Sequence, residues 1–331
     1  MRLLVLGGTS WVGGTVASLA VREGHEVTCL ARGESGPVPA GARWVRADRG
    51  ASGAYDDVAE EWDAVLDVSW QPSMVRSALD SLAGRVRHWA YVSSISVYAD
   101  HGHHDGDEHG DTVAPWSPAD QDVVATAEEY GAAKVSCETA CAEQIALDRL
   151  LVARPGLIAG HGDPSDRFGY WPAKVARAGG GAPGLLVPPL GGPVQVIDVE
   201  DLAAWLVQGC VERTAGVFDA VGDQVTLGAV LEACFDACGT RPRLHEAQES
   251  WLLERGVRPW AGPDSLPLWL PHASSGMVRR SGRAAREAGL AVRPLTQTVA
   301  GALRWEREQG VDRARRAGLR ADREAALVAA L

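Results

Sequence analysis

The sequence predicts an α/β fold, a doubly wound parallel sheet of the Rossmann type with a smaller, mainly C-terminal substrate lobe. The chain starts with a short apolar run, Leu3–Leu6, that breaks directly into two glycines and then into a helical pattern over Trp11–Arg22. Strand and helix patterns alternate as far as about residue 158, which predicts parallel strands with helices on both faces. The stretch 160–192 is then rich in glycine and proline, which indicates that the chain leaves the sheet.

The expected elements follow in order along the chain. After the first strand, we expect strands at Val27–Leu30, Arg43–Ala47, Ala64–Val68, His88–Ser93, Leu150–Ala153, Pro193–Asp198 and Gly216–Ala220. Helical patterns lie at Trp11–Arg22, at Ser73–Ala83, from Tyr130 to about Leu147, from Val199 to about Val211, at Thr226–Cys238 and at Thr296–Gln309.

Composition limits the classes of protein that fit. The chain has 331 residues, of which 46% are hydrophobic and 23% charged, as in soluble globular proteins with one or two domains. The net charge of −11 gives no support for a nucleic-acid partner. No apolar run approaches the ~20 residues that span a bilayer, and no leader pattern precedes the first strand. We therefore expect a cytoplasmic protein without a membrane partner.

The glycine turn after the first strand is the expected phosphate site. Its pattern is GxxSxxG, in which a strand, a tight turn and a helix N-terminus direct backbone N–H groups and the positive end of the helix dipole at one spot. The candidate residues for binding a dinucleotide here are Gly7, Thr9, Ser10, Trp11, Val12 and Gly13. We therefore assign residues 1–158 and about 194–222 to a dinucleotide-binding domain, and about 159–193 and 223–331 to a substrate lobe.

Residues at the ends of the next strands are expected to bind the rest of the dinucleotide. Arg32 follows the second strand, where an acidic residue would bind the ribose of NAD and an arginine can bind the 2′-phosphate of NADP. NADP(H) is therefore favoured, and NAD(H) beside a solvated Arg32 is the alternative. Asp48 is placed to hold the adenine amino group, and Ser69 and Trp70 to lie beside the ribose and pyrophosphate.

A tyrosine and a lysine four residues apart supply the expected chemistry. Tyr130 and Lys134 lie one helical turn apart on one face. A lysine charge there lowers the pKa of a phenol from about 10 and makes it a usable general acid or base. Serine hydroxyls in Ser93–Ser96, at the end of the fifth strand, can bind the same substrate oxygen. Such a set passes a hydride and a proton across a C–O bond of a small molecule.

From residue 1 to about 222 the chain resembles the short-chain dehydrogenase/reductase superfamily, in its extended, epimerase- and dehydratase-like branch. The resemblance rests on the glycine turn and on SSISVY at 93–98, YGAAK at 130–134, ARPGLI at 153–158 and VIDVEDLA at 196–203. It implies that Ser94, Tyr130 and Lys134 are catalytic, that Lys134 also holds the nicotinamide ribose, and that Pro155 to Ile158 contacts the nicotinamide. By analogy it also suggests a homodimer through the Tyr130 helix.

Departures from the family pattern narrow the function. Ser10 replaces the middle glycine, as in an atypical subgroup of reductase-like proteins and RNA-binding plastid relatives, and Ala31 replaces the usual acidic residue. Ile95 and Ser96 stand where sugar-nucleotide 4,6-dehydratases carry an Asp-Glu pair, which argues against a dehydratase. We favour an NADP-linked reductase or dehydrogenase. The alternatives are a nucleotide-sugar epimerase that retains NAD, and a non-catalytic cofactor sensor or RNA-binding relative, against which the intact catalytic set argues.

The substrate side offers a group of candidates in one loop. Besides Ser96, the residues Arg167, Phe168, Tyr170 and Trp171 provide a positive charge and flat apolar faces for a ring-bearing or anionic ligand. A loop packed by its own aromatic side chains fits the same pattern.

Three further features are expected to lack chemistry of their own. The histidine-rich loop 101–109 is interpreted as a lid over the site, with no metal bound. The six cysteines are scattered without a CxxC pair, which indicates small buried residues in a reducing compartment. The mixed charges of 304–323 predict a solvated helix face.

Overall fold

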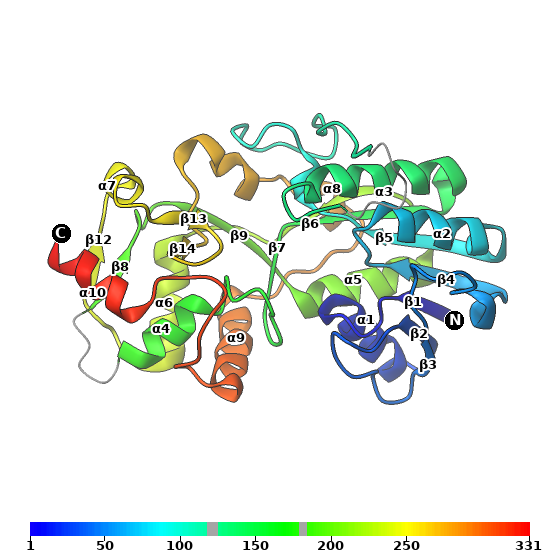
Figure 1. Cartoon of the computed structure of the whole chain (residues 1–331), viewed down its shortest axis with the longest axis horizontal. Helices are drawn as coiled ribbons and strands as arrows, with labels where there is room; N and C mark the ends of the chain where they lie inside the picture. The colour runs from blue at the N-terminus through cyan, green and yellow to red at the C-terminus, as the bar shows by residue number, and fades with distance from the viewer. Residues whose placement is uncertain (118–124, 179–183) are drawn as a thin grey trace.

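The computed structural model describes residues 1–117, 125–178 and 184–331. A seven-stranded sheet has the strand order β10-β6-β5-β4-β1-β2-β3, and every neighbouring pair in it is parallel. Its strands are β1 (Arg2–Leu6), β2 (Glu26–Ala31), β3 (Arg43–Arg46), β4 (Trp62–Asp67), β5 (Val86–Val92), β6 (Leu150–Pro155) and β10 (Gly216–Ala220). In Figure 1 this sheet and its helices lie on the right, and a smaller lobe lies on the left. The predicted α/β class is confirmed.

Helices cover both faces of the sheet. One face carries α1 and α5, and the other carries α2 and α3. Their bounds are α1 (Trp11–Arg22), α2 (Pro72–Leu82), α3 (Tyr130–Gln144) and α5 (Val199–Glu212). Within β1, Leu3 and Val5 belong to the core on the α1 face, whereas Leu4 and Leu6 belong to the core on the α3 face. Because both faces are buried, this strand needs apolar residues in both directions, which explains the unbroken apolar run.

The lobe has its own small sheets, helices and core. Its strands are β7 (Leu157–Ala159), β8 (Leu185–Val187), β9 (Pro193–Asp198), β11 (Gln224–Thr226), β12 (Leu244–Glu246), β13 (Arg258–Trp260) and β14 (Ser265–Pro267). Its helices are α4 (Tyr170–Ala178), α6 (Leu227–Cys238), α7 (Glu249–Glu254), α9 (Leu295–Gln309) and α10 (Ala321–Ala329), while the short α8 (Arg283–Glu287) contacts β10. The strand expected at 193–198 has the predicted bounds, but it pairs with β7 and β11 instead of joining the main sheet.

The charged tail folds back onto the lobe. Glu306 is 1% exposed and accepts hydrogen bonds from Arg313 and Arg315, at 3.0 and 2.6 Å. Asp166 is also buried, and accepts from the Arg313 guanidinium and, at 2.8 Å, from the backbone N–H of Arg316. We call these five residues the C-terminal clamp. The predicted solvated face is therefore wrong for the side chains of Arg313 and Arg315, which bind buried carboxylates of Asp166 and Glu306.

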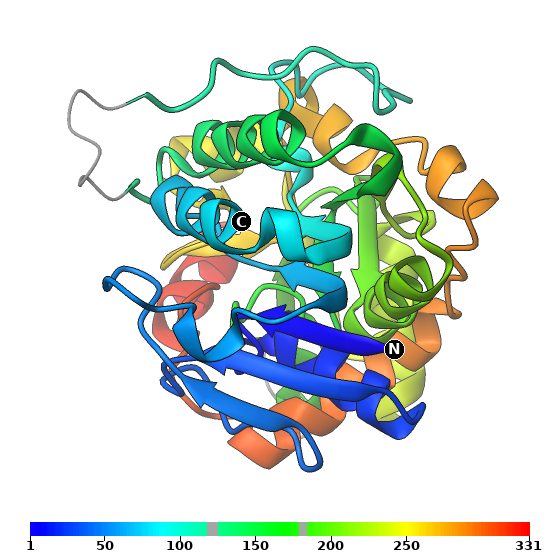
Figure 2. The same cartoon turned by 90° about the vertical axis from the view of Figure 1, so that its right-hand side faces the viewer.

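The histidine-rich loop is bound to a neighbouring turn of the chain. The backbone N–H of Asp105 donates to the carbonyl of Arg279 at 2.8 Å, and that of Ser281 to the carbonyl of Gly106 at 2.9 Å. These contacts hold the loop beside the 3₁₀ helix η5 (His272–Val278). In Figure 2 residues 99–117, the described part of the chain after β5, run along the outside of α3. Within the described ranges no group of His, Cys, Asp and Glu side chains could hold a metal ion. The later part of this connection, 118–124, lies outside the described residues.

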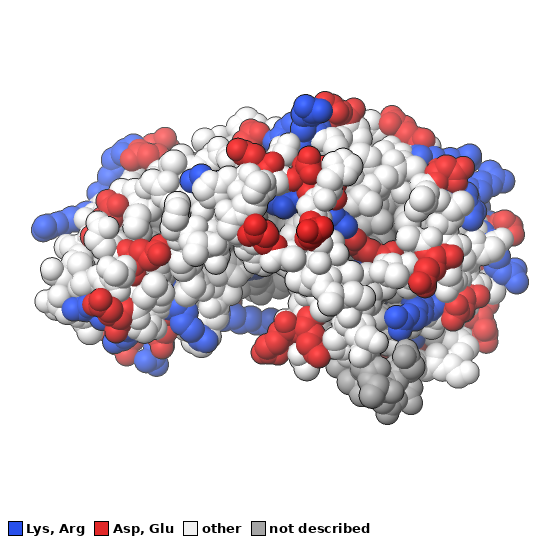
Figure 3. Space-filling model, turned by 90° about the horizontal axis from the view of Figure 1, so that it is seen from above, with Lys and Arg blue, Asp and Glu red and all other residues white. Residues whose placement is uncertain are grey.

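Three observations concern the chain as a whole. All six cysteines are free and five of them are buried, and burial raises the pKa of Cys29 and Cys137 to about 11. Among the described residues no helix has the length and apolar character needed to cross a membrane. On the face seen in Figure 3, acidic and basic side chains are interspersed.

Candidate active site

The glycine turn after β1 leaves no room for a side chain at Gly7 or Gly13. Gly7 has a φ of +94°, and a Cβ on Gly13 would lie 2.4 Å from the Gly7 carbonyl oxygen. The Ser10 hydroxyl donates to that same oxygen at 2.8 Å and accepts from the backbone N–H of Gly13 at 3.2 Å. Ser10 thus closes the turn and caps α1 where the family pattern has glycine. The remaining N–H groups of the first turn have no partner within the helix and, with the helix dipole, favour an anion.

Two adjoining cavities form a cleft across the carboxyl ends of the strands. The smaller, of about 200 Å³, is lined by the predicted residues Gly7, Thr9, Ser10, Arg32, Asp48 and Ser69. The larger, of about 570 Å³, is lined by the predicted residues Ser10, Trp11, Val12, Ser94, Ser96, Tyr130, Lys134, Pro155, Ile158 and Arg167. Ser10 and Val68 line both cavities, so the two are continuous past the glycine turn. Gly13 is buried beneath the turn.

The smaller cavity is also lined by Arg49, which forms a buried ion pair that was not predicted from the sequence. Arg49 donates to both carboxylate oxygens of the fully buried Asp67, at 2.7 and 2.6 Å, and Asp67 ends β4. A charged residue at the end of a buried strand is the signal that could have revealed it. The predicted Arg32 is largely exposed and lies 3.1 Å from the carboxylate of Glu34, which lines the same cavity. A 2′-phosphate would therefore share Arg32 with a carboxylate.

Lys134 is fixed at the inner end of the cleft. It is 2% exposed, and its Nζ donates to the carbonyl of Ser69 at 2.9 Å and to the carbonyl of Val92. The Nζ also lies 5.9 Å from the centroid of the Tyr130 ring. An ammonium has three donors, and its hydrogen bonds to Ser69 and Val92 use two of them within the described chain, so one N–H remains for a ligand.

Tyr130 begins α3 and lies against the serine turn. Ser94 caps the 3₁₀ helix η3 (Ile95–Val97), and its hydroxyl donates to the Ser96 hydroxyl at 3.1 Å. A Cβ on Gly131 would lie 2.3 Å from the Ser96 carbonyl oxygen, so glycine is required for α3 to pack this closely on η3. Trp70 was predicted to contact the cofactor. It lines neither cavity, and its ring lies 5.6 Å from the Tyr130 ring centroid.

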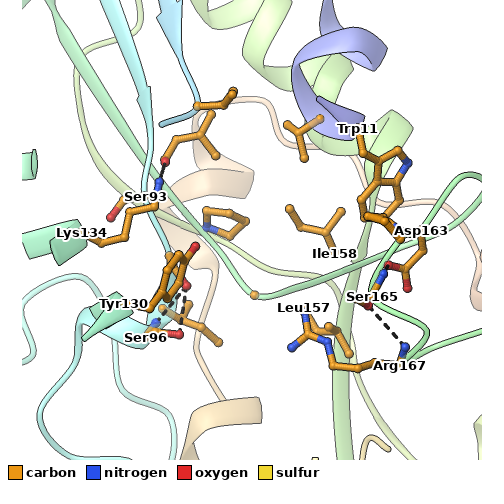
Figure 4. A pocket seen from close by; sticks show the side chains of 18 of the residues that line it. Trp11, Ser93, Ser96, Tyr130, Lys134, Leu157, Ile158, Asp163, Ser165 and Arg167 are labelled. Atoms are coloured by element: carbon orange, nitrogen blue, oxygen red, sulfur yellow. Dashed lines mark hydrogen bonds between the residues drawn. The ribbon is translucent and has the colours of Figure 1, made fainter. Parts of the chain in front are cut away.

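The opposite wall of the larger cavity comes from α1 and the loop 160–169. Figure 4 shows Trp11, Asp163, Ser165 and Arg167 on this side, with Tyr130, Ser96 and Lys134 facing them. The Trp11 indole donates to the carbonyl of His161 at 2.8 Å. Burial lowers the pKa of Arg167 and raises that of Asp163. Asp163 was not predicted as a site residue, although it lies only four residues before Arg167.

Three predicted substrate contacts do not reach the cavity. Phe168, Tyr170 and Trp171 are 0%, 2% and 0% exposed and belong to the core of the lobe. The Trp171 indole donates to the carbonyl of Pro267 at 2.9 Å, which satisfies its polar atom inside that core. The prediction that these aromatic residues bind substrate is therefore wrong, because the start of α4 turns them into the lobe. Arg167 alone of this group lines the cavity.

Comparison with known proteins identifies the fold. No protein-family model matches the chain, and no curated protein sequence matches it. A candidate epimerase from Burkholderia cenocepacia J2315 has 22% identity and a TM-score of 0.69, over 93% of this chain and 98% of that chain. A UDP-glucose 4-epimerase has 16% identity and a TM-score of 0.66, over 93% and 98%. The UDP-glucuronic acid 4-epimerase from Bacillus cereus, in complex with NAD, has 12% identity and a TM-score of 0.65, over 93% and 99%. The chain therefore shares the fold of these solved epimerase structures, which is the α/β fold that its motifs predicted.

Proposed function

We propose that the protein is a nicotinamide-dependent enzyme that moves a hydride to or from a C–O carbon of its substrate. The supporting observation is the meeting of Ser94, Tyr130 and Lys134 at the inner end of a cleft that starts at the glycine turn. A non-catalytic relative would have no need for this set. An enzyme therefore fits these residues better than a cofactor sensor or an RNA-binding protein.

The cleft fits a dinucleotide. The turn at Gly7 and Gly13 is too tight for side chains, which leaves backbone N–H groups of α1 for the diphosphate. Lys134, with its remaining N–H, is placed to bind ribose hydroxyls, while Pro155 and Ile158 line the far end. When bound there, the nicotinamide group supplies the hydride exchange.

The residues of this chain would handle the substrate oxygen and its proton. The Ser94 hydroxyl is placed to hydrogen-bond that oxygen, and the Tyr130 hydroxyl to take up or return its proton. The ammonium of Lys134 is held by two backbone carbonyls, and its Nζ lies 5.9 Å from the centroid of the Tyr130 ring, so its positive charge is fixed beside the phenol. Close packing at Gly131 holds the start of α3, with Tyr130, against the turn that carries Ser94.

For the substrate, the proposal is a nucleotide sugar that is epimerised by transient oxidation. Epimerases of this kind share the fold over 93% of the chain, and so over the lobe as well as the sheet. The reductase interpretation depended on NADP and on Arg32, but Arg32 is paired with Glu34. NAD is therefore the proposed cofactor, with NADP as the alternative. The homodimer through α3 stays a proposal, to be tested by light scattering.

Two measurements test the proposal. Tyr130→Phe should abolish most interconversion of a UDP-sugar and its 4-epimer while leaving cofactor affinity nearly unchanged, because the ring stays and only the hydroxyl is lost. Unchanged turnover in this variant would refute the assignment. Mass spectrometry of the gently purified protein should detect bound NAD, and bound NADP or an empty protein would favour the reductase instead.

A further inference from the structure

Two opposite charges line the larger cavity without binding each other. Asp163 is 2% exposed, and its Oδ1 accepts from the backbone N–H of Ser165 at 2.8 Å, whereas its buried Oδ2 has no hydrogen-bond partner. The Arg167 guanidinium lies 5.4 Å from the ring centroid of Trp260, and no ion pair to a carboxylate in the described ranges satisfies it. Figure 4 places both on the wall that faces Tyr130.

Each of these side chains lacks the partner that burial normally requires. A buried carboxylate oxygen needs a hydrogen-bond donor, and a half-buried guanidinium such as that of Arg167 is best satisfied by an anion. Both pKa shifts are in the direction expected of groups removed from water, because burial raises the pKa of Asp163 and lowers that of Arg167. A single molecule with a negative group and a nearby hydroxyl would satisfy both.

The loop that carries the two residues is fixed before any ligand arrives. Asp166, which lies between Asp163 and Arg167 in the sequence, is held by the Arg313 guanidinium and by the backbone N–H of Arg316. At the other end of the loop, the Trp11 indole binds the carbonyl of His161. Side chains on a segment held at both ends are positioned in advance for binding.

We propose that Asp163 and Arg167 form one substrate subsite, in which Arg167 binds an anionic group and the free oxygen of Asp163 accepts a hydrogen bond from a hydroxyl of the same molecule. The subsite rests on the proposed function, since it lies across the cavity from Tyr130. The ligand class is an anionic sugar. Its negative group is either the carboxylate of a sugar acid or the diphosphate of the nucleotide, and the two sources can be separated by experiment.

The experiment is a calorimetric titration of the full-length protein, loaded with NAD, with UDP-glucose, UDP-glucuronate and UDP. Arg167→Gln removes the charge, and Arg167→Lys restores it. Asp163→Asn retains an oxygen for the Ser165 N–H and replaces only the free oxygen with a donor. Matched controls are Arg304→Gln and Asp236→Asn, both exposed and outside the larger cavity. Thermal unfolding of each variant checks that it is folded.

We expect Arg167→Gln to weaken binding of UDP-glucuronate by about tenfold or more, as for a lost charged hydrogen bond. If UDP-glucose binding is unaffected, the anion is the sugar carboxylate. An equal loss for UDP-glucose and UDP assigns the diphosphate. Asp163→Asn should weaken both sugar-bearing ligands by about tenfold and leave UDP unchanged.

Wild-type affinities in both variants would overturn the subsite, and an unaffected Asp163→Asn alone would overturn its hydroxyl contact. Failure of the wild-type protein to bind either UDP-sugar would overturn the ligand class. These outcomes are separate from failure of the proposed function, because Tyr130→Phe is judged by turnover and the Asp163 and Arg167 variants are judged by binding.

Discussion

Replacing Gly131 by alanine tests how closely α3 must sit on the serine turn. The new Cβ would lie 2.3 Å from the Ser96 carbonyl oxygen. Ordinary carbon contacts begin near 3.5 Å, so the start of α3 must move away from η3 by about 1 Å. Because Tyr130 is the neighbouring residue, its hydroxyl moves with the helix. A misplacement of about 1 Å at a reacting centre costs roughly 100-fold in turnover.

The substitution should lower the stability of the protein without unfolding it. Alanine favours a helix over glycine by up to about 1 kcal/mol, whereas overpacking costs about 1–3 kcal/mol. The net loss of stability is therefore at most about 3 kcal/mol, which thermal unfolding can measure.

The assay is interconversion of a UDP-sugar and its epimer, followed by chromatography, together with NADH binding followed by fluorescence. Gly84→Ala is the matched control, because a Cβ there would have no heavy atom within 4 Å. Wild-type turnover in a folded Gly131→Ala protein would refute the argument that the contact between Gly131 and Ser96 sets the position of Tyr130.

Three further predictions concern the cofactor, pH and the clamp. Glu34→Gln should raise NADPH affinity about two- to fivefold by removing the carboxylate that competes for Arg32, as expected of an exposed ion pair; an unchanged ratio of NADPH to NADH affinity in fluorescence titrations would contradict this. His88 is buried without a hydrogen-bond partner, and burial lowers its pKa from 6.5 to about 4. Between pH 6.5 and 4, His88 therefore binds a proton in the unfolded chain but stays neutral in the folded protein. Up to about 3 kcal/mol of folding stability that is present above pH 6.5 is lost as the pH falls to 4. Between pH 7 and pH 4.5 the melting temperature of His88→Leu should fall less than that of the wild-type protein. An equal fall in both proteins would exclude His88 as the cause. Asp166→Asn should lower the folding stability by about 1–3 kcal/mol. It should also raise the KM for substrate more than the Kd for cofactor, and equal changes in both constants would argue against a local role for the clamp.

Local signals were sufficient for the sheet and for the helix that carries Tyr130 and Lys134. The helix α1 has the predicted bounds because a capping serine and a glycine turn mark its start. Tyr130 and Lys134 share a face because helical spacing alone brings residues four apart together. The buried strand Arg2–Leu6 shows as a continuous apolar run because helices cover both of its faces. In each case the deciding contacts lie within a short stretch of sequence.

The wall opposite Tyr130 depends on contacts between distant parts of the chain. Phe168, Tyr170 and Trp171 have the composition of a binding site, but whether they face cavity or core is decided by packing against segments far along the chain, such as Pro267. Asp166 and its clamp residue Arg313 are 147 positions apart. A single sequence contains no pattern that pairs such residues, so the polar network could not be predicted from it.

The C-terminal clamp has a consequence for how the protein is made and handled. Asp166 leaves the ribosome about 150 residues ahead of Arg313 and Arg316, and domains fold from the N-terminal side during synthesis. The half of the cleft that is built on the sheet can therefore fold early. The loop that carries Asp163 and Arg167 is fixed only after the C-terminal residues of the clamp have been synthesised. A chain cut after α9 is expected to retain nicotinamide binding and lose its affinity for substrate.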